Sequence, residues 1–152
     1  MTKRVIELDE LKTLVGQEIA VSGYVPLTQQ QINQFAETTG DHQWIHVDLE
    51  RARRESPYKT TIAHGFLTLS LISSLARDVI EIRGVRLGVN YGLDRVRFPG
   101  AVPSGSNIRA RVSVQAVEDI AGGIQAKFLY TVEREGEAKP CCVAEWVVRY
   151  YR

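Results

Sequence analysis

A stretch without charge constrains the fold of this chain more than any other feature of its sequence. Residues 60–76 contain no Asp, Glu, Lys or Arg, and their apolar side chains fall all around a helical circle. Seventeen residues that include several Ser and Thr are too few and too polar to cross a bilayer, which takes about 20 apolar residues. A helix that is apolar on every side is instead buried within a protein. The pattern predicts a central buried helix from Gly65 to about Ile82, ended by Gly84.

Alternation of apolar and polar residues predicts β-strands on the C-terminal side of this helix. The clearest runs are residues 107–117, 124–132 and 142–150. Shorter β-rich runs are residues 18–24, 85–91 and 95–98. We therefore expect an α+β fold, in which an antiparallel sheet of five or six strands wraps around the long central helix.

Length and composition indicate a single globular domain. The 152 residues, 44% of them hydrophobic and 24% charged, suit a single domain, which we assign to residues 1–152. The net charge is +1, from 19 basic and 18 acidic side chains. Such a balance gives no field that would hold the protein on nucleic acid or on an anionic membrane, so neither partner is expected.

Two adjacent cysteines indicate a reducing compartment. Cys141 and Cys142 lie in a strand-like segment, where neighbouring side chains point to opposite faces. This arrangement favours neither a disulfide nor a zinc site. Because the N-terminal residues also lack the apolar segment of a secretory signal, we expect a cytoplasmic protein.

Apolar residues also occupy the second faces of the predicted strands. They are Val117, Leu129, Val143, Val147 and Tyr151. Single apolar residues on a surface are common, but several on one sheet indicate a partner. We expect a homodimer.

A shorter helix is predicted over residues 29–39, and a polar loop follows it. Thr28 and Gln31 form a capping box at the helix start, and Gly40 suits the left-handed position after its last turn. Asp41 and His46 follow in the loop, where both side chains can turn toward one point. A carboxylate and an imidazole are the minimal set for activating a water molecule. The alternative is that Asp41 forms an Asx turn and that His46 is a solvated loop residue.

Gly65 is a second candidate for chemistry. It stands at the predicted N-terminus of the buried helix, where unpaired N–H groups and the positive end of the helix dipole stabilise an oxyanion. A glycine there lets a ligand approach the backbone closely, although glycine is also an ordinary N-cap.

Three segments resemble a known family. They are FAETTGDHQWIH (residues 35–46), AHGF (63–66) and YGLDRVRFP (91–99). Together they resemble the MaoC-like (R)-specific enoyl-CoA hydratases, which have a hot-dog fold, and most closely the short members with a single hot-dog domain, which include nodulation protein N-like sequences. The similarity runs from about residue 25 to the C-terminus, and the order of the segments agrees with a helix wrapped by a sheet.

The resemblance implies a function and a catalytic pair. Asp41 and His46 would hold a water that adds to C3 of a trans-2-enoyl thioester, while a proton reaches C2 on the same face. The Gly65 N–H would stabilise the enolate oxygen. The implied activity converts enoyl-CoA to (R)-3-hydroxyacyl-CoA and the reverse, without a cofactor.

One departure from the family motif concerns the catalytic loop. The motif is Gly-Asp, any residue, Asn-Pro, an aliphatic residue and His, whereas Gln43 and Trp44 stand here in place of Asn and Pro. By analogy with the Asn, Gln43 is expected to orient the water or the His46 ring. Trp44 is expected to narrow the pocket or to cover the loop.

Four further residues are assigned to substrate binding, each with a structural alternative. His64 lies at the helix entrance, where a hydrogen bond that holds the structure is the alternative. Ser73 lies eight residues after Gly65 on nearly the same helix face and lines an acyl tunnel, unless its hydroxyl only bonds back to the helix. Arg95 and Arg97 would reach the phosphates of CoA, unless they are simply solvated.

The sequence leaves three other kinds of site or function to consider. Potential metal ligands are Asp41, His42, His46, Asp48 and His64, but no metal site is expected, because Gly40 ends the helix that would align the histidines. A hot-dog thioesterase commonly uses a carboxylate on the central helix, and none occurs between Gly65 and Arg77. A non-catalytic acyl-thioester binding protein would explain the changes at Gln43 and Trp44.

Overall fold

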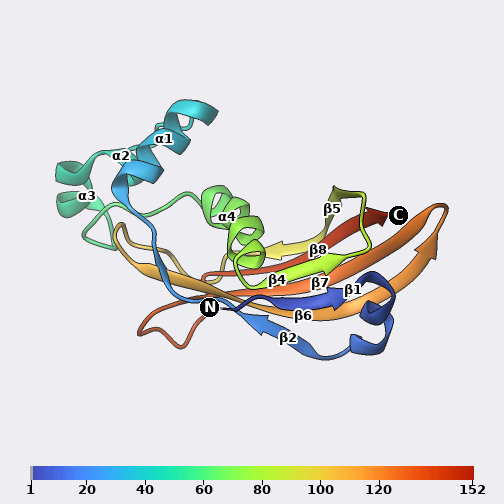
Figure 1. Cartoon of the computed structure of the whole chain (residues 1–152). Coiled ribbons are helices and arrows are strands. Elements are labelled where there is room, and N and C mark those ends of the chain that lie inside the picture. The colour runs from blue at the N-terminus through green and yellow to red at the C-terminus, as the bar shows by residue number, and fades with distance from the viewer. Residues whose placement is uncertain (1) are drawn as a thin grey trace.

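An antiparallel sheet of six strands forms the body of the computed structural model, which describes residues 2–152 (Figure 1). The strands run in the order β2-β6-β7-β8-β5, and β3 also pairs with β6. Their bounds are β2 Glu18–Val21, β3 Val25–Pro26, β5 Leu87–Arg97, β6 Asn107–Ile120, β7 Gly123–Arg134 and β8 Cys142–Tyr151. The α+β architecture and the number of strands agree with the sequence-based prediction.

The period-two segments fold as expected because alternate side chains enter the core. On β6, the buried side chains Ile108, Ala110, Val112 and Val114 alternate with half-buried polar ones. The two runs predicted at residues 85–91 and 95–98 form the single strand β5, whose pairing with β8 is interrupted by two register shifts. Such irregularities bend a strand without ending it.

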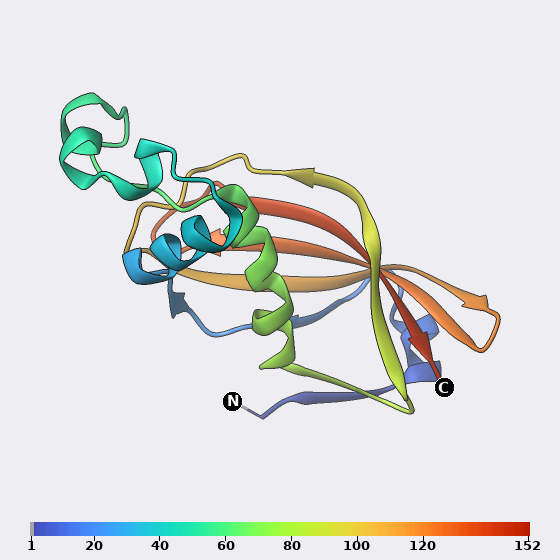
Figure 2. The same ribbon diagram turned by 90° about the horizontal axis from the view of Figure 1, so that it is seen from above.

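Helix α4 (Gly65–Arg77) lies across one face of this sheet (Figure 2). It begins where predicted, but its predicted end near Ile82 is wrong. Residues Ile80–Arg83 form strand β4, which pairs in parallel with β1 (Arg4–Glu7) at the N-terminus. A pairing partner more than 70 residues away therefore overrides the helical pattern, and the β-branched Ile80 and Ile82 suit the strand.

The remaining helices gather at one end of the sheet (Figures 1 and 2). They are α1 (Gln29–Thr39), α2 (Trp44–Val47) and α3 (Leu49–Glu55). The exception is the short 3-10 helix η1 (Leu8–Leu14), which follows β1. The predicted capping box between Thr28 and Gln31 is present, and Gly40 has a left-handed backbone with φ of 77°. Gly40 thus turns the chain sharply into the loop that carries Asp41.

Only one side of α4 is buried within the single chain. Leu67, Ile72 and Leu75 pack into the core, whereas Phe66 is 70% exposed and Ser70 is exposed. The expectation of a helix buried on every side is therefore wrong for one copy of the chain. Part of the apolar surface of α4 is left for something other than its own sheet.

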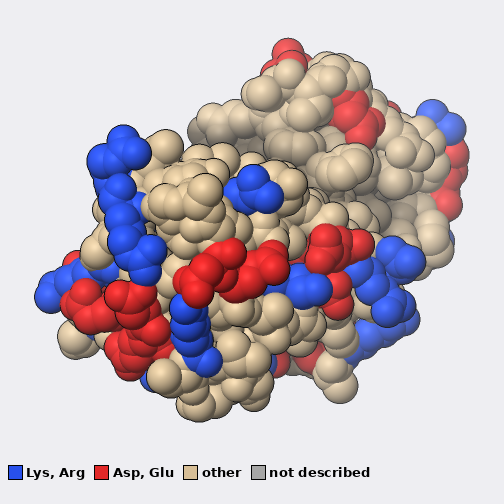
Figure 3. All heavy atoms as spheres, turned by 90° about the vertical axis from the view of Figure 1, so that its right-hand side faces the viewer, with Lys and Arg blue, Asp and Glu red and all other residues tan. Residues whose placement is uncertain are grey.

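Charged residues of both signs mix on the face shown in Figure 3. Near the tip of β6, Lys12 Nζ on η1 lies 2.7 Å from Asp119 Oδ2, and Arg152 pairs with Asp9. Exposed pairs of this kind stabilise a protein by at most about 1 kcal/mol each. Among residues 2–152, no helix is both long and apolar enough to span a membrane.

Candidate active site

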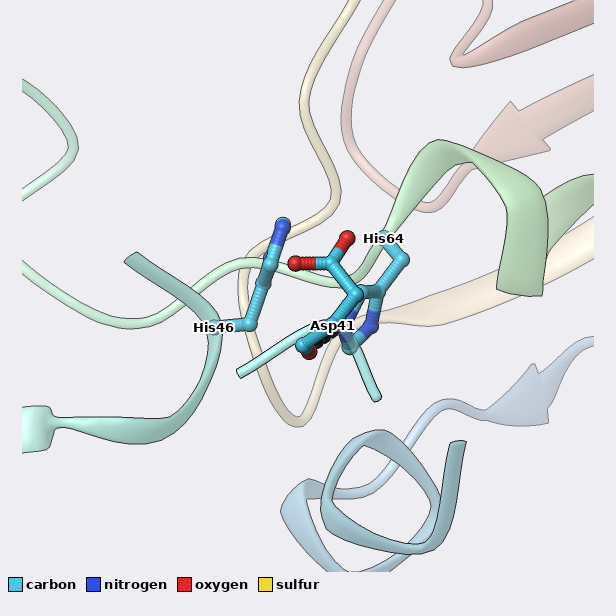
Figure 4. Close-up of side chains that lie close together, drawn as sticks. All are labelled: Asp41, His46 and His64. Carbon is cyan, nitrogen blue, oxygen red and sulfur yellow. Dashed lines mark hydrogen bonds between the residues drawn. The ribbon is translucent and has the colours of Figure 1, made fainter. Parts of the chain in front are cut away.

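Asp41, His46 and His64 come together from three segments of the chain (Figure 4). Asp41 lies in the loop after α1, His46 lies in α2, and His64 directly precedes α4. One potential ligand atom from each side chain lies within 4.8 Å of those of the other two. The structure therefore brings together the carboxylate and the imidazole that the sequence singled out, and it places beside them the imidazole of His64, which the sequence assigned to substrate binding.

The His46 ring is oriented by a main-chain carbonyl. Its Nδ1 lies 2.7 Å from the oxygen of Ile62, and the residue is only 7% exposed. Because a carbonyl can only accept a hydrogen bond, Nδ1 carries the proton and the neutral ring keeps its lone pair on Nε2. Burial lowers the pKa of His46 below 6.5, with a smaller contribution from His64, while the Ile62 hydrogen bond and Asp41 oppose this effect. His46 is thus suited to accept a proton at neutral pH.

A second set of hydrogen bonds holds the backbone of His46. Gln29 Nε2 donates to the His46 carbonyl at 2.8 Å, and Thr61 Oγ1 donates to Gln29 Oε1 at 2.6 Å. Sequence reasoning missed Gln29, Thr61 and Ile62. A polar residue in the first turn of α1 carries no distinguishing signal, and a main-chain carbonyl carries none at all, because every residue has one.

The Asp41 carboxylate is exposed and takes part in the turn. Its Oδ1 accepts a hydrogen bond from the Gln43 backbone N–H at 3.3 Å, which is an Asx-type contact. The structural alternative considered for Asp41 is therefore present. It engages one oxygen and leaves Oδ2 for another partner, so both roles are compatible.

His64 is the most buried member of the group, at 2% exposed. Its Nε2 donates to the backbone oxygen of Asp41 at 3.0 Å, and its ring stacks on that of His46 with centroids 3.9 Å apart. Its Nδ1 is buried and finds no hydrogen-bond partner within the described residues. The structure therefore places His64 inside the site as a hydrogen-bonding residue, in accord with the alternative considered for it.

Gly65 begins α4 immediately after His64. No side chain caps this helix end. The Leu67 and Thr68 N–H groups donate to the His64 carbonyl, which leaves the Gly65 N–H, at the very start of the helix, as the candidate donor to a ligand. A Cβ atom at position 65 would lie 3.1 Å from the ring of Phe98. Glycine is therefore favoured here by close packing, and the positive end of the α4 dipole faces the region of His64.

The geometry of the two histidines does not suit a shared metal ion. Their planes lie at only 25° to each other in a stack, so an ion that lies in the plane of one ring, close to its nitrogen, would lie out of the plane of the other. His42 lies near Glu37, with Nε2 3.6 Å from Oε1, and Asp48 caps α3 by accepting from the Arg51 N–H. The arrangement favours proton transfer between neighbouring groups.

Comparison with known proteins agrees with this site. Residues 10–135 match the model of the MaoC like domain. The chain is 51% identical over 142 residues to 3-hydroxyacyl-thioester dehydratase Z of Mycobacterium tuberculosis, which covers 93% of both chains. It is 42% identical to nodulation protein N of Rhizobium meliloti, over 93% of this chain and 89% of that protein. The chain belongs to the MaoC-like dehydratase family.

A solved structure supports the fold of this MaoC-like protein. R-hydratase PhaJ1 from Pseudomonas aeruginosa superposes with a TM-score of 0.72 at 23% identity, over 91% of this chain and 82% of that one. The family and the hot-dog fold predicted from the sequence are therefore confirmed.

In this MaoC-like chain, the departure from the family motif falls at the start of α2. Gln43 is the N-cap residue and makes no side-chain capping bond, and Trp44 is the first helical residue. Asn is a better N-cap than Gln, and Pro is common at the first helical position, so the usual motif starts this helix more strongly. Here the Arg51 guanidinium lies over the Trp44 ring at 4.4 Å and ties α2 to α3. The structure thus shows Trp44 bracing the loop.

Ser73 lines two neighbouring cavities beside α4. Its hydroxyl donates to the Ser70 carbonyl at 3.2 Å, as the structural alternative foresaw. One cavity of about 580 Å³ lies between α4, β4, β5 and the sheet, and the other, of about 270 Å³, lies nearer the start of α4. Both cavities share Ser73, Asn90 and Trp146. They follow α4 from its middle to its C-terminal end.

Arg95 and Arg97 are exposed near the end of β5. Arg97 Nη1 donates to the carbonyl of Val96 at 2.7 Å. Phe98, which packs on Gly65, follows directly in the chain. The two arginines therefore lie on the part of β5 nearest to the start of α4.

Proposed function

We propose that this protein is an (R)-specific enoyl-CoA hydratase, and in the reverse direction a 3-hydroxyacyl-CoA dehydratase. The observation that carries the proposal is that the side chains of Asp41 and His46 lie close together in a MaoC-like chain. The lone pair of His46 is on Nε2, and the start of α4, which no side chain caps, is nearby. The relatives at 42–51% identity support a hydro-lyase acting on a thioester, since one of them is a 3-hydroxyacyl-thioester dehydratase.

Water activation is assigned to Asp41 and His46. A water held between the free Asp41 oxygen and His46 Nε2 gives a proton to the pair as its oxygen bonds to C3 of the enoyl thioester. The C2=C3 electrons move toward the thioester carbonyl and form an enolate. A proton from the pair then reaches C2 on the same face, so the elements of one water are added and the catalyst is regenerated.

The enolate oxygen is assigned to the start of α4. C3 is electrophilic only when the thioester oxygen takes up negative charge. The Gly65 N–H and the helix dipole favour that charge, and removal of one such donor typically costs about 2.7–4 kcal/mol in the barrier. The close fit between Gly65 and Phe98 supports a fixed position for this N–H.

The substrate is assigned to the grooves around α4. The acyl chain is assigned to the two cavities that Ser73 lines, of about 580 and 270 Å³ beside α4. Arg95 and Arg97 are assigned to the phosphates of CoA, because a guanidinium binds phosphate in a forked geometry.

The direct test is a panel of trans-2-enoyl-CoA substrates of increasing chain length, with the stereochemistry of the product determined. We expect loss of the enoyl-thioester absorbance and formation of the (R)-3-hydroxy product. Release of free CoA thiol would instead indicate a thioesterase, although α4 has no acidic residue before Asp78 at its far end. Thermal stabilisation by acyl-CoA without turnover would indicate a binding protein.

We also propose a homodimer formed by the edge strand β5. This strand is last in the sheet order and bonds only to β8 within the main sheet, so one side of its backbone is unpaired. Its apolar side chains Leu87, Tyr91 and Leu93 are 41–56% exposed, and Phe66 lies uncovered on α4. The β5 strand of a second copy would extend the sheet antiparallel and cover these residues.

This interface differs from the one expected from the sequence. The five apolar residues assigned to the second faces of the strands are half-buried or buried within one chain, and Val147 is only 5% exposed. They are Val117, Leu129, Val143, Val147 and Tyr151. We place the protein in the cytoplasm, in keeping with its two buried free thiols.

Light scattering after size exclusion tests the dimer. We expect the mass of two chains for the wild type and a monomer for Leu93→Lys at the same concentration, because a charge on an edge strand disfavours pairing. Leu49→Lys is the matched control, since Leu49 on α3 is equally exposed at 41% but far from β5 in sequence. A wild-type monomer at high concentration, or a dimer unaffected by Leu93→Lys, would contradict the interface.

A further inference from the structure

His64 touches every part of the candidate site. Through Nε2 it bonds to the backbone of Asp41, through its ring face it stacks on His46, and through the peptide bond it precedes Gly65. No other side chain in the described part of the chain makes these three connections. His64 therefore connects Asp41, His46 and the start of α4, and its contacts set their relative positions.

The bond to Asp41 holds a residue that has few other restraints. The Asp41 side chain is exposed, its N–H makes only a long contact of 3.4 Å with Thr39 Oγ1, and Gly40 before it has a left-handed backbone. The hydrogen bond from His64, in contrast, comes from a residue that is 2% exposed. A buried donor thus fixes the main chain of an otherwise exposed carboxylate.

The stack on His46 fixes the second member of the pair. The two ring centroids are 3.9 Å apart at 25°, and Phe35 packs against His64 at 4.9 Å. Together with the Ile62 carbonyl, which fixes the rotation of the His46 ring in its own plane, the stack limits its tilt. The direction of the lone pair on His46 Nε2 is therefore fixed against both rotation and tilt of the ring.

This arrangement leaves one buried nitrogen of His64 without a hydrogen-bond partner in the described part of the chain, which lowers the stability of the fold. His64 Nδ1 has no hydrogen bond among residues 2–152, and an unsatisfied buried polar atom destabilises a fold. If packing were the only requirement, an apolar ring would fill the same space without this cost. Buried polar atoms normally have hydrogen-bond partners, and an exception within a cluster of polar side chains indicates a functional role.

We propose that His64 is a positioning residue for the hydration reaction: its Nε2–H sets the Asp41 main chain, and its ring face sets the imidazole of His46. This inference rests on the proposed function. It replaces the sequence-based assignment of His64 to substrate binding. In this role His64 affects the chemical step and leaves substrate binding largely unchanged.

Three substitutions separate the two contacts. His64→Gln keeps a donor at about the reach of Nε2 and removes the ring. His64→Phe keeps the ring and removes the donor, and His64→Ala removes both. His42→Ala is the control, because His42 is a histidine of the same loop that is half exposed and lies near Glu37, outside the cluster. Each variant is assayed with crotonyl-CoA for kcat and KM, and its thermal unfolding midpoint is recorded.

The donor is expected to dominate. We expect His64→Ala and His64→Phe to lower kcat about 100-fold with KM changed by less than about threefold, because a misplacement of about 1 Å costs this much in rate. His64→Gln should retain kcat to within about tenfold, and His42→Ala should match the wild type. Retention by Gln without retention by Phe is a result that packing alone does not produce.

Other outcomes would overturn the proposal. A folded His64→Phe with the wild-type kcat would remove the need for the donor, and a His64→Gln no better than His64→Ala would contradict the dominant role of the donor. A rise in KM with unchanged kcat would return His64 to substrate binding. If the Ala variant fails to fold, the Gln and Phe variants decide, since both keep a large side chain. Inactive wild-type protein would overturn the proposed function itself, which is a separate result.

Discussion

The two ends of helix α4 differ in how they are built. At the N-terminal end, His64 and the neighbouring Asp41 and His46 are fixed by hydrogen bonds of 2.7–3.3 Å and by a ring stack. Along the middle and C-terminal half, Ser73 and Ala76 face cavities of about 270 and 580 Å³ that are otherwise lined mostly by side chains of the sheet and of β4 and β5.

This difference separates two tasks on one helix. Proton transfer needs groups held to a fraction of an ångström, which directional hydrogen bonds provide. Accommodation of an acyl chain needs only volume and apolar surface, which packing provides. Substitutions at the first end should therefore alter kcat for every substrate, whereas substitutions at the second should alter the preference for chain length.

The largest effect is expected at the polar end. Asp41→Asn keeps the size of the side chain and removes its charge, so it should lower kcat by about 10²- to 10⁴-fold for all chain lengths, in the range ascribed to general acid–base groups. The unfolding midpoint should change little, because the Asp41 side chain is exposed. Steady-state hydration of crotonyl-CoA, with thermal unfolding alongside, measures both. Activity near the wild-type level would refute the assignment of Asp41.

The next effect is expected in the cavities and should depend on the substrate. Ser73→Phe places a ring where the two cavities meet, and we expect kcat/KM for an eight-carbon enoyl-CoA to fall about 10- to 100-fold, with crotonyl-CoA changed by less than about threefold. Ser74→Phe is the matched control, because Ser74 is also exposed on α4 but lines neither cavity. Equal losses for both substrates would break the division between the two ends.

A smaller effect is expected at Gly65. The methyl group of Gly65→Ala would lie 3.1 Å from the Phe98 ring, so the start of α4 or the ring must shift by a few tenths of an ångström. We expect kcat to fall about tenfold, because a displaced N–H stabilises the enolate less well. A smaller side chain at position 98 should relieve the close contact with the methyl group, so the double variant Gly65→Ala/Phe98→Leu should recover most of the lost kcat. Absence of recovery would mean that the methyl group acts in another way.

The mildest test varies pH. Burial lowers the pKa of His46 below 6.5, and its neutral form is the proton acceptor. We therefore expect kcat/KM to level off at alkaline pH and to fall at lower pH, with the midpoint below 6.5. The same shift means that the unfolded chain binds protons more readily, so stability contributed by neutral His46 is complete above pH 6.5 and is lost as the pH falls through the folded pKa. A midpoint above 6.5 would contradict a buried base.

Local patterns predicted much of the fold, and long-range contacts decided the rest. The capping box at Thr28 and the start of α4 at Gly65 were predictable, because caps depend on neighbouring residues. The end of α4 was not, because β4 pairs with β1 at the far N-terminus. In the site, Asp41 and His46 were predictable as residue types five positions apart. The Ile62 carbonyl and the Gln29 side chain, which hold His46, were not.

The sequence by itself determined an antiparallel sheet packed on a central helix that is free of charge up to Ala76, together with a carboxylate and an imidazole that suit water activation and a glycine that suits an oxyanion, while the thioester substrate followed from the resemblance to a family. Periodicity and residue type are enough for this, because both act through local geometry and intrinsic chemistry. Only the tertiary structure decided which nitrogen of His46 carries the proton, that His64 contacts both Asp41 and His46, and that β5 is left with an open edge. Each of these depends on burial or on a hydrogen bond between residues distant in the chain, which no local pattern specifies.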